Sequence, residues 1–259
     1  MSDLPADLLD ALERFCARPR VLAAFDFDGV LAPIVAEPSA ARALPASADA
    51  LAELTRLDDV VVALVSGRAL ADLRAVASPP EGVVLVASHG AEVAGAPPPD
   101  VPLDVLEQVV SGLEAVVAEH PGTAVELKPA AAVLHTRRAA RDVAARATDA
   151  ALAAAARVDG AHVMRGKEVV EVSVVQADKG SALVSLADSL GVDAVMYVGD
   201  DVTDEHAFAA VTARGCDDDV TVRVGDGDTA ARYRVASPEA VTALLHQLLA
   251  LRHRVAPSQ

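Results

Sequence analysis

Short apolar runs alternate with helical patterns along much of this 259-residue chain, and no other feature limits its possible folds as strongly. The runs are rich in Val, Leu or Ala and lie at Val21–Phe25, Val60–Val65, Val83–Ala87, Ala194–Val198 and Val220–Val224. Apolar runs without polar alternation are typical of strands buried on both faces of a parallel sheet. Helical patterns lie between or after them, near Ala46–Leu57, Leu70–Ala77, Gly180–Leu190, Thr203–Val211 and Pro238–Leu251. Strands that alternate with helices predict an α/β fold with a doubly wound, Rossmann-like parallel sheet.

The middle third of the chain breaks this alternation. A proline-rich stretch, AGAPPPDVP at 94–102, is typical of a linker between domains. Beyond it we expect helices at Leu103–Glu119 and Ala139–Arg157 and strands at Ala124–Lys128, Ala131–Thr136, His162–Arg165 and Val169–Val174. The order αββαββ predicts a small open-faced sheet covered by two helices. Residues 98–175 are therefore predicted to form an inserted α/β domain, and residues 1–97 and 176–259 to form the core.

Two carboxylates follow the first apolar run directly, in the sequence DFDG at 26–29. Residues two apart on an extended chain point to the same side, so Asp26 and Asp28 are expected together where open α/β sheets bind ligands. Their mutual repulsion calls for a divalent cation, and oxygen ligands favour magnesium. A calcium EF-hand is excluded because that loop needs glycine at its sixth position, whereas Gly29 is the fourth residue from Asp26.

Three further strand ends carry polar residues of the same kind. Asp200, Asp201 and Asp204 follow the run at 194–198; taken alone they could be a helix-capping cluster, but their place at the same sheet edge as Asp26 and Asp28 favours a shared site. Ser66 and Gly67 follow the run at 60–65 and could hold a phosphate oxygen or cap the next helix. Lys179 lies at the start of a predicted helix, where the helix dipole disfavours a positive charge. Its position is explained if its ammonium group faces the acidic residues and a phosphate.

Charge and composition limit the partners. The formal net charge of −16 argues against nucleic acid and against anionic membranes. No apolar stretch is long enough for a transmembrane helix, the first residues lack signal-peptide character, and Cys16 and Cys216 form no disulfide framework or metal-ligand spacing. We therefore expect a cytoplasmic protein, as a monomer, whose partner is a small molecule. Only three of its 22 basic residues are lysines.

The ordered set DFDGV, SGR, DKG and GDDVTDE resembles the four motifs of the haloacid-dehalogenase phosphatase superfamily. The resemblance implies that Asp26 is the nucleophile, that Asp28 is the general acid and base, that Ser66 binds the phosphoryl group and that Lys179 balances charge. It further implies a Mg²⁺ site formed by Asp26, the Asp28 main-chain carbonyl and Asp200. Asp204 would be a further ligand or would support the other ligands.

The stretches SHGAE, ELKPAAAVLHTR and GKEVVEV, together with GDDVTDEHAF, are similar to the trehalose-6-phosphate phosphatase family. This similarity implies hydrolysis of trehalose 6-phosphate in trehalose biosynthesis, with the inserted domain acting as a substrate-recognition cap. The residues implied to contact or surround the substrate are Arg68, His89, Gly90, Glu126, Lys128, His135, Lys167 and Glu171. Two of the three lysines of the chain, Lys128 and Lys167, fall within these stretches, and the third, Lys179, lies in the DKG motif.

Several alternatives remain open at the level of sequence. The charged residues of the inserted domain could be an exposed sheet face with incidental ion pairs, and His135 and His89 could serve packing alone. Another capped sugar phosphatase, acting on sucrose 6-phosphate or mannosyl-3-phosphoglycerate, shares the core motifs. A phosphomutase shares them too, while the intact set of Asp26, Asp28, Lys179 and Asp200 argues against an inactive binding domain.

Overall fold

The computed structural model describes residues 4–96, 100–166, 168–175 and 177–255. The chain divides into two compact units, residues 1–96 with 177–259 and residues 97–176, and each is described by itself. The first unit is the core and the second is the inserted domain.

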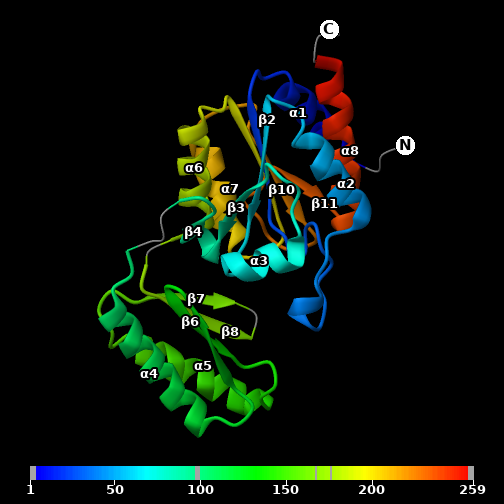
Figure 1. The fold of residues 1–259 in the computed structure, drawn as a ribbon. Helices are drawn as coiled ribbons and strands as arrows, with labels where there is room; N and C mark the ends of the chain where they lie inside the picture. The colour runs from blue at the N-terminus through cyan, green and yellow to red at the C-terminus, as the bar shows by residue number, and fades with distance from the viewer. Residues whose placement is uncertain (1–3, 97–99, 167, 176, 256–259) are drawn as a thin grey trace. The chain divides into compact units, whose positions relative to one another are not determined.

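A seven-stranded sheet forms the centre of the core (Figure 1). The strands are β1 (Val21–Phe25), β2 (Val60–Val65), β3 (Val84–Ala87), β4 (Glu92–Val93), β9 (Ala194–Gly199), β10 (Val220–Val224) and β11 (Tyr233–Val235). They are ordered β11-β10-β9-β1-β2-β3-β4, and only β4 is antiparallel to its neighbour. The order places β1 between β2 and β9, so the residues after these three strands emerge at one edge of the sheet.

Helices cover both faces of this sheet, as the doubly wound prediction requires. One face packs against α1 (Ala6–Cys16), α2 (Pro45–Leu54), α3 (Leu70–Ala77) and α8 (Pro238–Val255), and the other against α6 (Lys179–Leu190) and α7 (Asp204–Ala213). Strand β1 is buried throughout because its alternate residues contact the two layers in turn: Phe25 lies in one apolar cluster and Ala24 in the other. Short 3-10 turns lie at Pro38–Ala40, between β1 and α2, and at Ser88–Gly90, between β3 and β4.

The inserted domain is a four-stranded antiparallel sheet with two helices on one face. Its strands are β5 (Ala124–Lys128), β6 (Ala131–His135), β7 (His162–Gly166) and β8 (Val169–Ser173), in the order β5-β6-β8-β7, and its helices are α4 (Leu103–Glu119) and α5 (Arg141–Ala155). Leu134 and Val172 point to the helices and form a small core with Leu113 and Ala151. The opposite face of the sheet carries the charged residues of β5 and β8.

The predicted α/β architecture with a doubly wound parallel sheet is confirmed. Several boundaries shift by one to four residues, and the short edge strands β4 and β11 were not expected. Both have at most three residues, too few to give an apolar run or an alternation. None of the helices in the described ranges combines the length and apolar character that crossing a membrane needs.

Candidate active site

Asp26 lies directly after the carboxyl end of β1, at the sheet edge where the sequence predicts a ligand-binding site. Its main-chain N–H donates to the carbonyl of Val198 at 2.9 Å, which extends the pairing of β1 with β9 by one residue. One carboxylate oxygen, Oδ1, accepts from the N–H of Phe27 at 2.6 Å, and the other, Oδ2, accepts from Lys179 Nζ at 2.6 Å. The side chain is buried, so these donors fix its orientation.

Asp204 connects Lys179 to the rest of the site. Its Oδ1 accepts from Lys179 Nζ at 2.8 Å and from the hydroxyl of Tyr197 at 2.7 Å. Its Oδ2 accepts from the main-chain N–H groups of Asp200 and Asp201, at 2.8 and 2.9 Å. A carboxylate offers about four lone-pair directions, so this fully buried group is saturated by protein donors. The geometry favours Asp204 as a support for Lys179 and the Asp200 loop over direct coordination of a metal.

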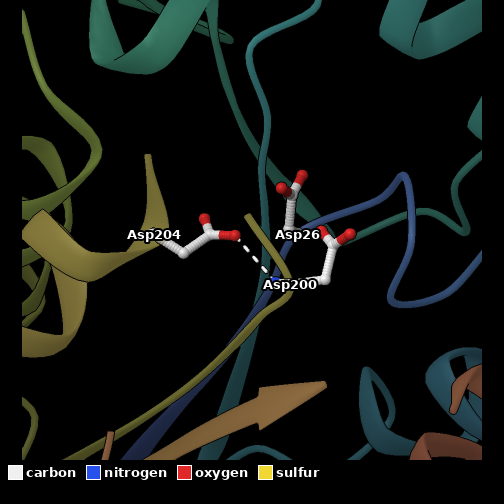
Figure 2. A group of neighbouring side chains, drawn as sticks. All are labelled: Asp26, Asp200 and Asp204. Atoms are coloured by element: carbon white, nitrogen blue, oxygen red, sulfur yellow. Dashed lines mark hydrogen bonds between the residues drawn. The ribbon is translucent and has the colours of Figure 1, made fainter. Parts of the chain in front are cut away.

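Figure 2 shows the carboxylates that could surround a cation. Asp26, Asp200 and Asp204 each have an oxygen within 4.8 Å of those of the other two. Burial, followed by the charges of Asp204 and Asp201, raises the pKa of Asp200 to about 7. Such a cluster has an excess of negative charge that a divalent cation would neutralise, and oxygen donors suit Mg²⁺. The site therefore fits a divalent cation, which the side chains of Asp26 and Asp200 could hold.

The turn after β1 leaves room for Asp200 only because residue 29 is glycine. Gly29 has φ +74°, and a Cβ atom built there would lie 2.0 Å from Asp200 Oδ2. Any larger residue would therefore displace the Asp200 carboxylate. The main-chain N–H of Gly29 donates to Ala32 O at 2.8 Å, which closes the turn.

The buried charges of the core site shift one another's pKa values. Burial raises the pKa of Asp26, with Asp204 and Asp200 adding to the shift while Lys179 opposes it. Burial alone would lower the pKa of Lys179, but its contacts with Asp26 and Asp204 outweigh burial and raise it. Asp204 has a lowered pKa because Lys179 and the main-chain donors outweigh its burial. Lys179 is therefore held as a cation between the two carboxylates.

Asp28 points to a different partner. Arg68 donates to both of its oxygens, through Nε to Oδ2 at 2.6 Å and through Nη2 to Oδ1 at 2.8 Å. This hydrogen bonding to Asp28 raises the pKa of Arg68, so the guanidinium remains charged. The Asp28 carboxylate does not belong to the cluster of Asp26, Asp200 and Asp204. The two aspartates of DFDG thus have separate surroundings, and the expectation that both carboxylates lie together at one cation site is not met, because Arg68 holds the side chain of Asp28.

Ser66 and the His89–Gly90 turn lie beside each other. Ser66 follows β2, is buried, and its Oγ accepts from the main-chain N–H of Arg68 at 3.2 Å, so its own hydroxyl proton can be donated elsewhere. The N–H of His89 donates to Ser66 O at 3.0 Å, and a Cβ at Gly67 would lie 2.4 Å from the imidazole. Gly90 has φ +109°, and a Cβ there would lie 2.9 Å from Asp178 O. The turn therefore packs between the Ser66 segment and the start of α6.

The predicted residues of the inserted domain form two pairs on the face of the sheet away from the helices. Lys128 Nζ donates to Glu171 Oε2 at 2.6 Å, and both side chains are largely buried, at 8% and 12% exposure. His135 Nε2 lies 2.8 Å from Glu126 Oε2, with both side chains about half exposed. Lys167, the remaining predicted residue, lies outside the described residues.

Two residues of this site were missed by sequence reasoning. Tyr197, which donates to Asp204, stood inside the apolar run of β9 and was counted as core. A hydroxyl in a fully buried strand needs a partner, and that requirement was the available signal. Asp72 accepts from Arg68 Nη1 at 2.6 Å, and its spacing of four residues from Arg68 could have indicated the pair.

Comparisons with known proteins show the family to which this chain is similar. Residues 24–239 match the family model described as trehalose-phosphatase. The trehalose-phosphate phosphatase of Mycobacterium marinum is 36% identical over 264 residues, which is 93% of this chain and 65% of that protein. The Mycobacterium tuberculosis protein of the same name is 35% identical over 271 residues, 96% of this chain and 66% of its own length. This chain therefore spans just under two thirds of these relatives.

A solved structure of a protein with this name has a similar fold. The C-terminal domain of Candida albicans trehalose-6-phosphate phosphatase superimposes with a TM-score of 0.80 at 25% identity, covering 96% of this chain and 99% of that domain. The family model covers most of the chain, from residue 24 within β1 to residue 239 within α8. The chain belongs to the trehalose-phosphatase family.

Proposed function

We propose that this chain hydrolyses trehalose 6-phosphate to trehalose and phosphate, as a step of trehalose biosynthesis, with Mg²⁺ as cofactor. The observation that carries the proposal is the buried Asp26 carboxylate, held by Lys179 at the end of β1 beside Asp200 in a chain of the trehalose-phosphatase family. An anchored carboxylate with a neighbouring cation is the arrangement that nucleophilic phosphoryl transfer needs.

The reaction would proceed in two steps that use Asp26 and Asp28 differently. In the first, a carboxylate oxygen of Asp26 forms a bond to phosphorus and the bond from phosphorus to the sugar oxygen breaks. Asp28 gives a proton to that leaving oxygen. In the second step, water attacks phosphorus, its proton passes to Asp28, and the aspartyl-phosphate bond breaks. The sum is phosphate ester plus water giving alcohol plus phosphate.

The residues around Asp26 would position the phosphoryl group and balance its negative charge. Lys179 would offset the negative charge of Asp26 and of the phosphoryl oxygens, and Asp204 would keep its ammonium in place. Ser66 would donate its hydroxyl to a phosphoryl oxygen. Asp26, Asp200 and the Asp28 carbonyl would hold Mg²⁺, whose chemistry is to neutralise phosphoryl charge.

We further propose that the inserted domain recognises the sugar through Glu126, Lys128, His135, Lys167 and Glu171. The buried pair of Lys128 and Glu171 supports this role, since carboxylate and ammonium groups on one sheet face suit a polyhydroxyl ligand. His89 and Gly90 would shape the phosphate side of the site in the core.

A panel assay of phosphate release tests the activity. Trehalose 6-phosphate, sucrose 6-phosphate, mannosyl-3-phosphoglycerate and glucose 6-phosphate would be compared with and without Mg²⁺. We expect preference for trehalose 6-phosphate and loss of activity with chelator. Preference for another sugar would overturn the substrate but not the chemistry. Asp26→Asn should abolish turnover while the fold stays intact by circular dichroism, and the exposed-site control Asp142→Asn should behave as the parent.

Lys128→Ala tests the role of the inserted domain. The loss in kcat/KM should be at least tenfold for trehalose 6-phosphate and less than twofold for p-nitrophenyl phosphate, because the aryl ester has no sugar to recognise. Arg146→Ala is the matched control, since Arg146 is an exposed cation of the same domain, paired with Asp142. Equal losses on both substrates would contradict sugar recognition by this face.

We propose a cytoplasmic monomer that acts on this small sugar phosphate. The net charge of −16 and the two free cysteines, one of them buried, support this setting. Size-exclusion chromatography with light scattering tests the oligomeric state, and a mass near 53 kDa, about twice the 26.5 kDa of this chain, would contradict a monomer.

A further inference from the structure

The guanidinium of Arg68 is held almost entirely by the protein. It donates to both oxygens of Asp28, through Nη1 to Asp72 Oδ2 at 2.6 Å, and through Nη2 to Pro38 O at 2.9 Å. A guanidinium has five N–H donors, so four of them are used by these contacts. This arrangement differs from that of a side chain held ready for a substrate phosphate, which would need its donors to face the ligand.

Packing fixes the same side chain further. The Arg68 guanidinium lies over the ring of Phe27, 5.9 Å from the ring centroid, and its side chain is only 11% exposed. Phe27, the residue between Asp26 and Asp28 in the sequence, is itself buried. Asp72 lies on α3, so a helix of the core anchors the far side of the guanidinium. Arg68 therefore cannot move without breaking contacts to three separate segments.

Two-point contact also fixes the carboxylate that Arg68 holds. A carboxylate that accepts two parallel N–H bonds from one guanidinium lies in its plane, which sets both the position and the rotation of the group. Each oxygen of Asp28 keeps another lone-pair direction, so the carboxyl group can still form a hydrogen bond to a leaving oxygen. About a third of this side chain is exposed, and that part is accessible to a ligand.

We propose that Arg68 is a positioning residue for Asp28, with Asp72 as the anchor that holds Arg68 in place. The inference rests on the proposed phosphatase function and adds a residue pair to it. The affected event is the first transfer, in which the Asp26–phosphorus bond forms, the bond to the leaving oxygen breaks and the Asp28 proton passes to that oxygen. A misplaced Asp28 slows this event only when the leaving oxygen needs the proton.

Leaving groups of different acidity test this dependence. The value of kcat/KM reports the steps up to release of the alcohol, so we would measure it for phenyl phosphate, p-nitrophenyl phosphate and trehalose 6-phosphate. General acid catalysis contributes about 10² to 10⁴ in rate. Arg68→Ala should lower kcat/KM about 100-fold for the two poor leaving groups and less than threefold for p-nitrophenyl phosphate. Equal losses on all three would overturn the proposal and assign Arg68 to phosphate binding, and no loss would overturn it as well.

A double-mutant cycle with Asp28→Asn separates the two roles independently. If Arg68 acts through Asp28, adding Arg68→Ala to Asp28→Asn should change kcat/KM by less than about twofold. If Arg68 binds the phosphate itself, the second substitution should cost as much as it does in the parent. That outcome would refute positioning.

Conservative variants cover the case in which Arg68→Ala fails to fold. Arg68→Lys keeps the charge but cannot chelate both oxygens, so it should show the same leaving-group dependence as Arg68→Ala. Asp72→Asn should show a smaller loss, about tenfold, with the same dependence. Parental kinetics for Arg68→Lys would overturn the two-point contact as the cause.

Arg74→Ala is the control variant, and the aryl esters separate a failure of the proposed substrate from a failure of the positioning proposal. Arg74 is an exposed arginine on the same helix as Asp72, and Arg74→Ala should leave all three substrates unaffected. If the parent fails on trehalose 6-phosphate but hydrolyses both aryl esters, the proposed substrate fails while the positioning test still stands on those esters.

Discussion

Asp200 gives the proposed Mg²⁺ site a pH dependence that can be measured without turnover. Burial and the charges of Asp204 and Asp201 raise the pKa of this carboxyl to about 7. An acid with a raised pKa retains its proton at pH 6, and a metal ligand must be deprotonated. With a pKa of about 7, the ionised fraction is about one eleventh at pH 6 and about ten elevenths at pH 8.

The sign and size of the effect follow directly. Mg²⁺ should bind about tenfold more weakly at pH 6 than at pH 8, which corresponds to about 1.4 kcal/mol. Asp200 should contribute about 0.9 proton at pH 6 and about 0.1 at pH 8 to the protons released on binding. Isothermal titration calorimetry in two buffers of different ionisation enthalpy measures both quantities.

Two variants sharpen this experiment. Asp201→Asn removes one of the charges that raise the pKa of Asp200, so the difference between pH 6 and pH 8 should shrink. Asp142→Asn removes an exposed charge in the inserted domain and should leave the difference unchanged. Equal Mg²⁺ affinity at the two pH values, with no dependence of the heat on the buffer, would refute the argument.

Three further substitutions have defined expectations. Gly29→Ala places a Cβ against Asp200 and should weaken Mg²⁺ binding about tenfold or more by calorimetry; parental affinity would show that the carboxylate has another position. Tyr197→Phe leaves the buried Asp204 short of one donor and should lower the free energy of unfolding by about 1–3 kcal/mol in urea denaturation, so an unchanged value would contradict the contact. Arg252, buried in α8, donates to four main-chain carbonyls. Arg252→Met should therefore lower the free energy of unfolding by about 3–5 kcal/mol in the same assay. A loss below about 1 kcal/mol would show that water replaces the guanidinium as the donor to these carbonyls.

Much of the core fold was predictable because its signals are local. Strands β1, β2 and β10 coincide with the expected apolar runs, since a strand buried on both faces needs apolar residues at every position. The edge strands β4 and β11 were not predictable, because so short a strand is defined by the neighbour with which it pairs. Helix ends moved by a few residues, since several lack a side-chain cap that would mark them.

Part of the candidate site was also predictable from the sequence, and part was not. The parallel sheet brings Asp26, Ser66 and Asp200 to one edge because each follows one of three adjacent strands. Lys179 was expected to face acidic residues, and it contacts Asp26. The pairing of Lys128 with Glu171 was not specified, since the sequence predicted only that both lie on the same face of the sheet.

The sequence by itself determined the alternation of strands and helices, the place of the insertion and the acidic residues that follow the core strands. These depend on the period of apolar residues and on the rule that parallel strands end at one edge. Only the tertiary structure decided that Arg68 contacts Asp28 and that Tyr197 and Lys179 both donate to one oxygen of Asp204. The physical reason is that a hydrogen-bond partner is chosen by the distance and direction between side chains on different elements, and these are set by how the elements pack.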